Sequence, residues 1–204
     1  MTDSGEVCKD CELTLPFLEE SLCFDEMEPI HRLYCALSYD RKVPDGMAAF
    51  KFRGKAHLSA YFADLMMECM GLELMEEYCD CVVAVPMHSA KLRKRGYNQA
   101  QLLADELSRK LNVPVSRCLK KVRRSETQHN LSGRERRKAQ KNSYGCTALH
   151  GEKVLLIDDI CTTGSTLREC ARTLRAAGAS CVIAATVCKT PYRNSSVLVE
   201  DEQL

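Results

Sequence analysis

A chain of 204 residues, 45% hydrophobic and 28% charged, is long enough for one sizeable core and has the composition of a globular protein. The formal net charge of +1 argues against bulk attraction to nucleic acid or to an acidic membrane, so anion binding must come from local clusters. No apolar run is long enough to span a bilayer and the first residues do not resemble a signal peptide, so we expect a cytoplasmic protein with no membrane partner. The thirteen cysteines are odd in number and lie mostly within apolar patterns, which predicts reduced thiols.

The first 33 residues differ from the rest because they are acidic and show little sustained periodicity, and we expect them to form a small cap. Cys8 and Cys11 form a C-x-x-C pair that can share a zinc ion, but a structural site needs two further ligands. Cys23 is a third candidate, and Glu26 or His31 would be a strained fourth. Because a second C-x-x-C pair is absent, two interpretations stay open: a degenerate zinc site, or reduced cysteines that bind no metal.

The first regular elements lie between residues 33 and 72. The apolar run at 33–39 predicts a strand. In residues 57–72 apolar side chains recur at helical spacing, which predicts an amphipathic helix. Such a helix covers a core with its apolar face, so we expect its methionines and aromatic side chains in the core rather than against a cofactor.

Between these two elements the chain reads Phe50-Lys51-Phe52-Arg53-Gly54. With Lys55, its two cations form a mild basic cluster. Two interpretations of this cluster are equally good at this point. The cations lie either on a solvated surface patch or against a substrate.

Residues 81–85 form another short apolar run and predict a strand, which Pro86 ends because proline cannot donate to a sheet ladder. The predicted loop that follows contains Met87–Arg95, here called the basic segment, with four cations within five residues. A helix is predicted from Asn98. A basic run usually marks a solvated surface, but at the carboxyl end of a sheet strand it can neutralise a bound anion.

Residues 113–122 predict a strand with an irregular start at Pro114. Residues 123–142 are the most polar part of the chain and bury almost nothing, so we expect them to move. They form either a disordered surface loop or a lid that closes over a ligand. Residues 144–149 then predict a further strand.

The most informative stretch runs from Val154 to Thr166. Its apolar run, Val-Leu-Leu-Ile, predicts a strand buried on both faces that stops at Asp158 and Asp159, here called the acid pair. Thr162–Thr166, here called the hydroxyl loop, opens a predicted helix. Free helix amides and hydroxyls suit a phosphate, whereas adjacent carboxylates suit sugar hydroxyls or a divalent cation. The predicted ligand is therefore a phosphorylated sugar.

This stretch resembles the signature of the type I phosphoribosyltransferases, in which a hydrophobic strand ends in two acids and a Thr/Gly-rich loop. Two other segments, Val85–Ala100 and Phe50–Gly54, are similar to landmarks of one branch, the competence protein ComF family. The three segments occur in the family's order. The resemblance implies an α/β fold with a mostly parallel twisted sheet flanked by helices, and a small N-terminal cysteine-containing cap.

The implied domain organisation has three parts. Residues 1–33 are the cap, 34–190 the phosphoribosyltransferase domain, and 191–204 a polar C-terminal tail. The apolar run at 181–188 gives the domain its last predicted strand, because Gly178 is a suitable stop for the helix before it.

The resemblance also implies a role for each segment, with phosphoribosyl pyrophosphate and Mg²⁺ as ligands. The acid pair would contact the ribose 2′ and 3′ hydroxyls. The other implied contacts are Thr162, Thr163, Gly164, Ser165 and Thr166 for the 5′-phosphate and Met87, His88, Lys91, Arg93 and Arg95 for the pyrophosphate. The matching positions of the flexible lid are Gln128, Leu131, Arg134 and Arg137.

The implied activity is transfer of the phosphoribosyl group to an acceptor, with release of pyrophosphate. The sequence does not identify the acceptor, and no residue stands out as its general base. The alternative is a non-catalytic protein that binds phosphoribosyl pyrophosphate and assists DNA uptake. No motif supports contact with nucleic acid, since tryptophan is absent and aromatic residues make up 6% of the chain. The resemblance is compatible with a homodimer.

Overall fold

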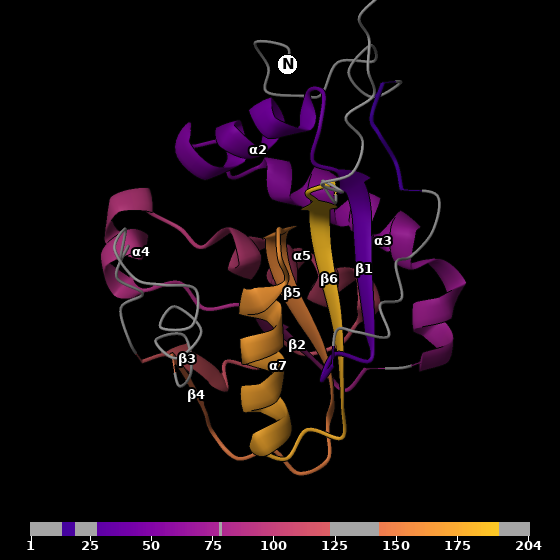
Figure 1. Ribbon diagram of the computed structural model, residues 1–204, viewed down its shortest axis with the longest axis vertical. Helices are drawn as coiled ribbons and strands as arrows, with labels where there is room; N and C mark the ends of the chain where they lie inside the picture. Colours follow the sequence, from indigo (N-terminus) through magenta and orange to yellow (C-terminus); the bar gives the residue numbers. More distant parts are fainter. Residues whose placement is uncertain (1–13, 19–27, 78, 123–142, 192–204) are drawn as a thin grey trace, which may run out of the picture.

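The structure is a computed structural model, and it describes residues 14–18, 28–77, 79–122 and 143–191, without the side chains of 72–77. Within these residues, four parallel strands form the central sheet in the order β1-β6-β5-β2 (Figure 1). A separate antiparallel pair joins β3 to β4. The strands are β1 (Arg32–Ser38), β2 (Cys81–Ala84), β3 (Leu119–Lys121), β4 (Tyr144–Cys146), β5 (Lys153–Cys161) and β6 (Cys181–Lys189).

Uninterrupted apolar runs become the sheet because its strands are covered on both faces. Val154–Ile157 of β5 are fully buried, and β1 and β6 are buried along nearly their whole length. This confirms the strands predicted at 33–39, 81–85, 154–157 and 181–188. The strand predicted at 113–122 is shorter, because only Leu119–Lys121 form regular pairs. The strand predicted at 144–149 is also shorter, and it pairs with β3 outside the main sheet.

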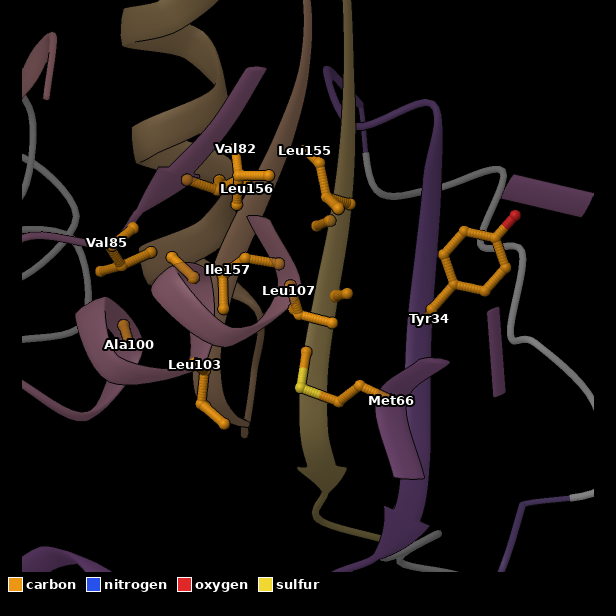
Figure 2. Close-up of a cluster of buried hydrophobic side chains, with 14 of the residues drawn as sticks. Tyr34, Met66, Val82, Val85, Ala100, Leu103, Leu107, Leu155, Leu156 and Ile157 are labelled. Carbon is orange, nitrogen blue, oxygen red and sulfur yellow. The ribbon is translucent and has the colours of Figure 1, made fainter. Parts of the chain in front are cut away.

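The helices are α2 (Val43–Phe52), α3 (Leu58–Glu77), α4 (Ser89–Arg95), α5 (Gln99–Leu111) and α7 (Ser165–Ala176). Helix α3 packs on β1 and β6, and α5 packs on β2 and β5. Figure 2 shows Met66 of α3 and Leu107 of α5 over the strands, as the predicted amphipathic patterns require. Helix α3 bends at Gly71, whose φ of 49° and ψ of −150° are non-helical, so its first part ends close to the predicted end at residue 72.

The opposite face of the sheet is covered by α7, which packs on β5 and β6 and also contacts β4. The chain therefore leaves β2 toward one face, through α5, and leaves β5 toward the other face, through α7. For open α/β sheets, neighbouring strands whose connections diverge in this way predict a crevice at their carboxyl ends, which is where such sheets bind ligands. The basic segment follows β2 and the hydroxyl loop follows β5, so both lie at this crevice.

The N-terminal part of the chain pairs with β1, the edge strand on the opposite side of the sheet from β2. Phe17 forms an antiparallel bridge with Leu37 of β1, and the Ser38 amide donates to the Pro16 carbonyl at 2.9 Å. The predicted domain limits at residues 33 and 190 remain predictions. None of the helices in the described part of the chain is long and apolar enough to cross a membrane.

Two turns meet closely at the end of the sheet opposite the crevice. Gly178 has a φ of 114°, and a Cβ built on it would lie 2.2 Å from the Leu149 carbonyl oxygen. Gly151 lies in the adjoining turn with a φ of 99°, and a Cβ built there would meet nothing within 4 Å. The two glycines therefore share the same backbone strain, but only Gly178 faces a steric clash.

We expect Gly178→Ala to lower the free energy of unfolding by about 2–5 kcal/mol, because backbone strain and the clash with Leu149 add. The matched control Gly151→Ala should lose about 1–2 kcal/mol from backbone strain alone. Urea unfolding of both variants measures the difference. Equal losses would contradict the close approach of the two turns.

Candidate functional site

The acid pair lies within β5, not after it. Strand β5 continues through Cys161, with Asp158 opposite Thr186 of β6 and Ile160 opposite Cys188. Strand β2 ends at Ala84, which pairs with Ile157, so β5 runs past its neighbour on that side. The prediction that the strand stops at Asp158 was wrong because pairing with β6 outweighs the low strand propensity of aspartate. The acid pair is consequently part of a fixed ladder.

The two carboxylates leave β5 on opposite faces, because successive side chains of a strand alternate. Both residues are partly buried. On one face, the Lys51 ammonium of α2 lies 3.0 Å from a carboxylate oxygen of Asp159. The exposed fractions of these two side chains are 18% and 14%, so the ion pair is sheltered from water.

On the other face, the charge of Asp158 interacts with Lys121, Tyr144 and Cys170, and its carboxylate accepts a 2.9 Å hydrogen bond from the Asp159 amide. Burial raises the pKa of Asp158 to about 7, and the negative charge of Asp159 adds to the increase. The Asp159 amide, Lys51 and Lys121 oppose it. Asp158 therefore holds a proton at higher pH than an ordinary aspartate does.

Lys121 is a site residue that the sequence did not reveal. It ends β3, and its ammonium donates to the Tyr144 hydroxyl at 3.2 Å while lying 5.0 Å from the centre of the ring. Burial lowers the pKa of Lys121, the positive charge of Lys91 lowers it further, and Asp158 raises it. Lys121 is thus close enough to interact with both Lys91 of the basic segment and Asp158 of the acid pair. In the sequence it is one of several adjacent cations, with no signal to separate it from the others.

The hydroxyl loop joins β5 to α7 in a tight turn. Gly164 is buried and adopts a φ of 70°, a left-handed conformation that favours glycine. The Thr163 hydroxyl donates to the Ser165 hydroxyl at 3.1 Å, and the Arg168 guanidinium donates to the Thr163 carbonyl at 2.7 Å. The first amides of α7 have no partner within the helix, and Thr162 and Thr163 are exposed beside them. Arg168 is a second residue that the sequence did not single out.

The basic segment is largely helical, which corrects the predicted loop over 87–96. Helix α4 begins after His88, whose Nδ1 accepts from the Ala90 amide at 3.2 Å. Lys91 and Arg93 are exposed, as a role in anion binding would require. Arg95 differs, because its guanidinium donates to the Gln99 side chain at 2.9 Å and lies 4.8 Å from the centre of the Phe52 ring. Met87 is partly buried in the turn before the helix.

The C-terminal turn of α2 connects the separate motifs. The Phe50 carbonyl accepts hydrogen bonds from the Tyr97 hydroxyl and from the Gln99 side-chain amide. In Figure 1, α2 lies over the carboxyl ends of the sheet strands. The run Phe50–Gly54 therefore contacts both the acid pair, through Lys51, and the chain that follows the basic segment.

Two predicted sets of residues lie outside the described residues. These are the cysteine set Cys8, Cys11 and Cys23 with Glu26, and the lid positions Gln128, Leu131, Arg134 and Arg137. His31, the other candidate for a fourth zinc ligand, is described and exposed. Elsewhere in the described chain, no group of three or more His, Cys, Asp or Glu side chains is arranged to hold a metal ion. The ten cysteines of the described residues are free thiols.

The raised pKa of Asp158 predicts how stability depends on pH. Folding favours the protonated acid, so this contribution is complete below pH 4 and is lost as the pH rises to about 7. We expect the free energy of unfolding of Asp158→Asn, relative to the unmodified protein, to rise from pH 4 to pH 7 by at most about 1.4 kcal/mol per pH unit. Denaturant unfolding across this range measures the change. A constant or falling difference would mean that Asp158 is ionised in the folded protein.

Comparisons with known proteins identify the family of the chain. A family model of the phosphoribosyl transferase domain matches residues 98–203, which is more than half of the chain. The DNA utilization protein YhgH of Salmonella typhimurium is 30% identical over 195 residues, covering 90% of this chain and 84% of that protein. Competence protein F of Haemophilus influenzae is 38% identical over 104 residues, which are 48% of this chain and 45% of that protein.

Among solved structures, purine phosphoribosyltransferase from Pyrococcus horikoshii is 16% identical with a TM-score of 0.41, over 63% of this chain and 73% of that one. The domain match and the parallel sheet with helices on both faces confirm the predicted α/β fold of type I phosphoribosyltransferases. The chain belongs to the ComF family of type I phosphoribosyltransferase-like proteins.

Proposed function

We propose that the protein binds phosphoribosyl pyrophosphate with Mg²⁺ and transfers the phosphoribosyl group to an acceptor. The observation that carries this proposal is the position of the acid pair, between a loop rich in hydroxyls and amides and a segment rich in cations. Phosphoribosyl pyrophosphate, here called the donor, carries matching groups in the same order: a phosphate, a sugar with two free hydroxyls, and a pyrophosphate. Family membership supports the same choice.

The donor would lie along the crevice with its 5′-phosphate at the hydroxyl loop. There the amides of α7 and the hydroxyls of Thr163 and Ser165 are suitable donors for phosphate. The ribose 2′ and 3′ hydroxyls would donate to the acid pair. The pyrophosphate would lie toward Lys91, Arg93 and Lys121, and a bound anion would relieve the repulsion between Lys91 and Lys121.

The residues present fit a magnesium ion that arrives with the donor. Asp159 is paired with Lys51, and no metal-binding cluster occurs among the described residues, so that part of the chain offers no dedicated cage. Mg²⁺ commonly keeps several waters and is held by substrate phosphates with one or two carboxylates. When bound, it would offset the charge that builds on the departing pyrophosphate.

In the proposed reaction, the bond from the sugar carbon C1 to the pyrophosphate oxygen breaks and its electron pair leaves with the pyrophosphate. The acceptor donates an electron pair to C1 and loses a proton. The acid pair would orient the ribose and stabilise the positive charge that develops on it. The hydroxyl loop would anchor the 5′-phosphate, a remote contact that positions C1 for attack. Residues Gln128, Arg134 and Arg137 are proposed to exclude water as a lid.

A second function is favoured by the names of the relatives, which refer to DNA utilization and competence. Under this alternative the protein binds phosphoribosyl pyrophosphate without turning it over and assists the use of DNA. The described residues include no evident general base for an acceptor, which is consistent with either function. Release of pyrophosphate in the presence of Mg²⁺ and a panel of nucleobases and amines separates the two: release supports transfer, and binding without release supports the alternative.

We expect Asp158→Asn with Asp159→Asn to reduce turnover by at least about 1,000-fold, because the ribose loses both carboxylate contacts and the charge that stabilises its cation. Pyrophosphate release measures turnover, and circular dichroism checks that the fold is intact. Turnover within tenfold of the unmodified protein would contradict the assignment of the acid pair.

Gly164→Ala should weaken binding of phosphoribosyl pyrophosphate about tenfold, because alanine is strained at a φ of 70° and the turn before α7 must shift. Calorimetry with Mg²⁺ measures the affinity. Gly151→Ala is the matched control, since it has similar backbone strain at the opposite end of the sheet and should bind normally. Equal affinities for the two variants would show that the hydroxyl loop does not hold the donor.

A further inference from the structure

We propose that Lys51 is a positioning residue of the donor site, which holds the Asp159 carboxylate at the carboxyl edge of the sheet. The inference rests on the proposed function. Lys51 lies outside residues 98–203, the part of the chain that matches the phosphoribosyl transferase domain. The donor site would therefore be completed by a helix from the N-terminal half of the chain.

Because side chains alternate along β5, one of the two acids needs a partner that directs it toward the edge of the sheet. Asp158 and Asp159 start on opposite faces of the sheet, yet both must address one sugar at its edge. The Lys51 ammonium lies 3.0 Å from the Asp159 carboxylate and comes from α2, which lies over the carboxyl ends of the strands (Figure 1). The ion pair thus draws this carboxylate toward the edge where the ribose would bind.

The ion pair is sheltered enough to have this effect. A surface pair gains little because water and salt screen it, whereas a desolvated pair loses strongly when one partner is removed. Lys51 and Asp159 are less than one-fifth exposed. Without Lys51, the Asp159 carboxylate would be partly buried, beside the charge of Asp158, with no cation opposite it.

The backbone that carries Lys51 is itself held in place. The Phe50 side chain is fully buried, with its ring 5.4 Å from that of Phe62 and 6.3 Å from that of Tyr97, measured between centroids. The Phe50 carbonyl accepts hydrogen bonds from Tyr97 and Gln99. Only the side chain of Lys51 is then left to adjust, and its length allows it to follow the carboxylate when the sugar binds.

The same turn of α2 provides a matched control. Arg53 follows two residues later, is exposed, and carries the same charge. Arg53→Met removes one positive charge from the turn without touching the ion pair. If Lys51→Met changes donor binding and Arg53→Met does not, the change comes from the position of Lys51 beside Asp159 and not from the loss of one positive charge.

The test measures binding of phosphoribosyl pyrophosphate by calorimetry in excess MgCl₂. Lys51→Met is expected to weaken binding at least about tenfold, Lys51→Arg to stay within about threefold because arginine can keep the pair, and Arg53→Met to stay within about twofold. If Lys51→Met binds as tightly as the unmodified protein, the inference is overturned and the proposed function stands. If the unmodified protein does not bind at all, the proposed function fails and the inference falls with it.

A double-mutant cycle shows whether Lys51 acts through Asp159. Adding Lys51→Met to Asp159→Asn should change affinity by no more than about twofold, because the residue that it positions is already altered. If the loss of affinity in the double variant equals the product of the losses in the two single variants, the inference is overturned, since Lys51 would then contact the donor independently. The double variant also lacks the uncompensated buried charge, so it serves as the test if Lys51→Met alone does not fold.

Discussion

The arrangement of the site depends on two neighbouring carboxylates on a buried strand. Asp158 and Asp159 lie on β5 where it is still paired with β6, so neither can move away from the other. Their repulsion is reduced in two ways: Lys51 approaches Asp159 on one face, and burial raises the pKa of Asp158 on the other, although the nearby Lys121 opposes that rise. A ligand that donates hydroxyl hydrogen bonds would satisfy both acids.

The topology of the sheet explains why this pair is available to a ligand. Strand β2 ends beside Ile157, and the connections that leave β2 and β5 run to opposite faces. The acid pair therefore lies at the edge where a crevice is expected, with the basic segment after β2 and the hydroxyl loop after β5. Helix α2 covers this edge, and its hydrogen bonds to Tyr97 and Gln99 tie it to the chain that follows the basic segment.

The parts of the fold that the sequence predicted well are those with unbroken local patterns. The run Val154–Ile157 favours a strand covered on both faces, and the apolar spacing at 57–72 favours a helix with one buried face. The errors arose where tertiary pairing outweighs local preference. Strand β5 continues through two aspartates because Asp158 and Ile160 on either side of Asp159 pair with β6, and α4 is a helix although its cations show no apolar periodicity.

The site was predictable as three separate motifs but not as one assembly. The acids, the hydroxyl loop and the basic segment each had recognisable chemistry. The contacts that join them did not, because Lys51 and Lys121 resemble many other surface lysines until the fold places them beside Asp159 and Tyr144. Only the packing of α2 and of β3 distinguishes them from solvated cations.

The central claim is that one crevice holds the two ends of an activated pentose. Its most direct test is a calorimetric titration of phosphoribosyl pyrophosphate in the presence of Mg²⁺, repeated with ribose 5-phosphate or pyrophosphate already present. The account predicts one molecule bound per chain and competition by each fragment, because each occupies one half of the crevice. Absence of binding, or binding that neither fragment reduces, would contradict it.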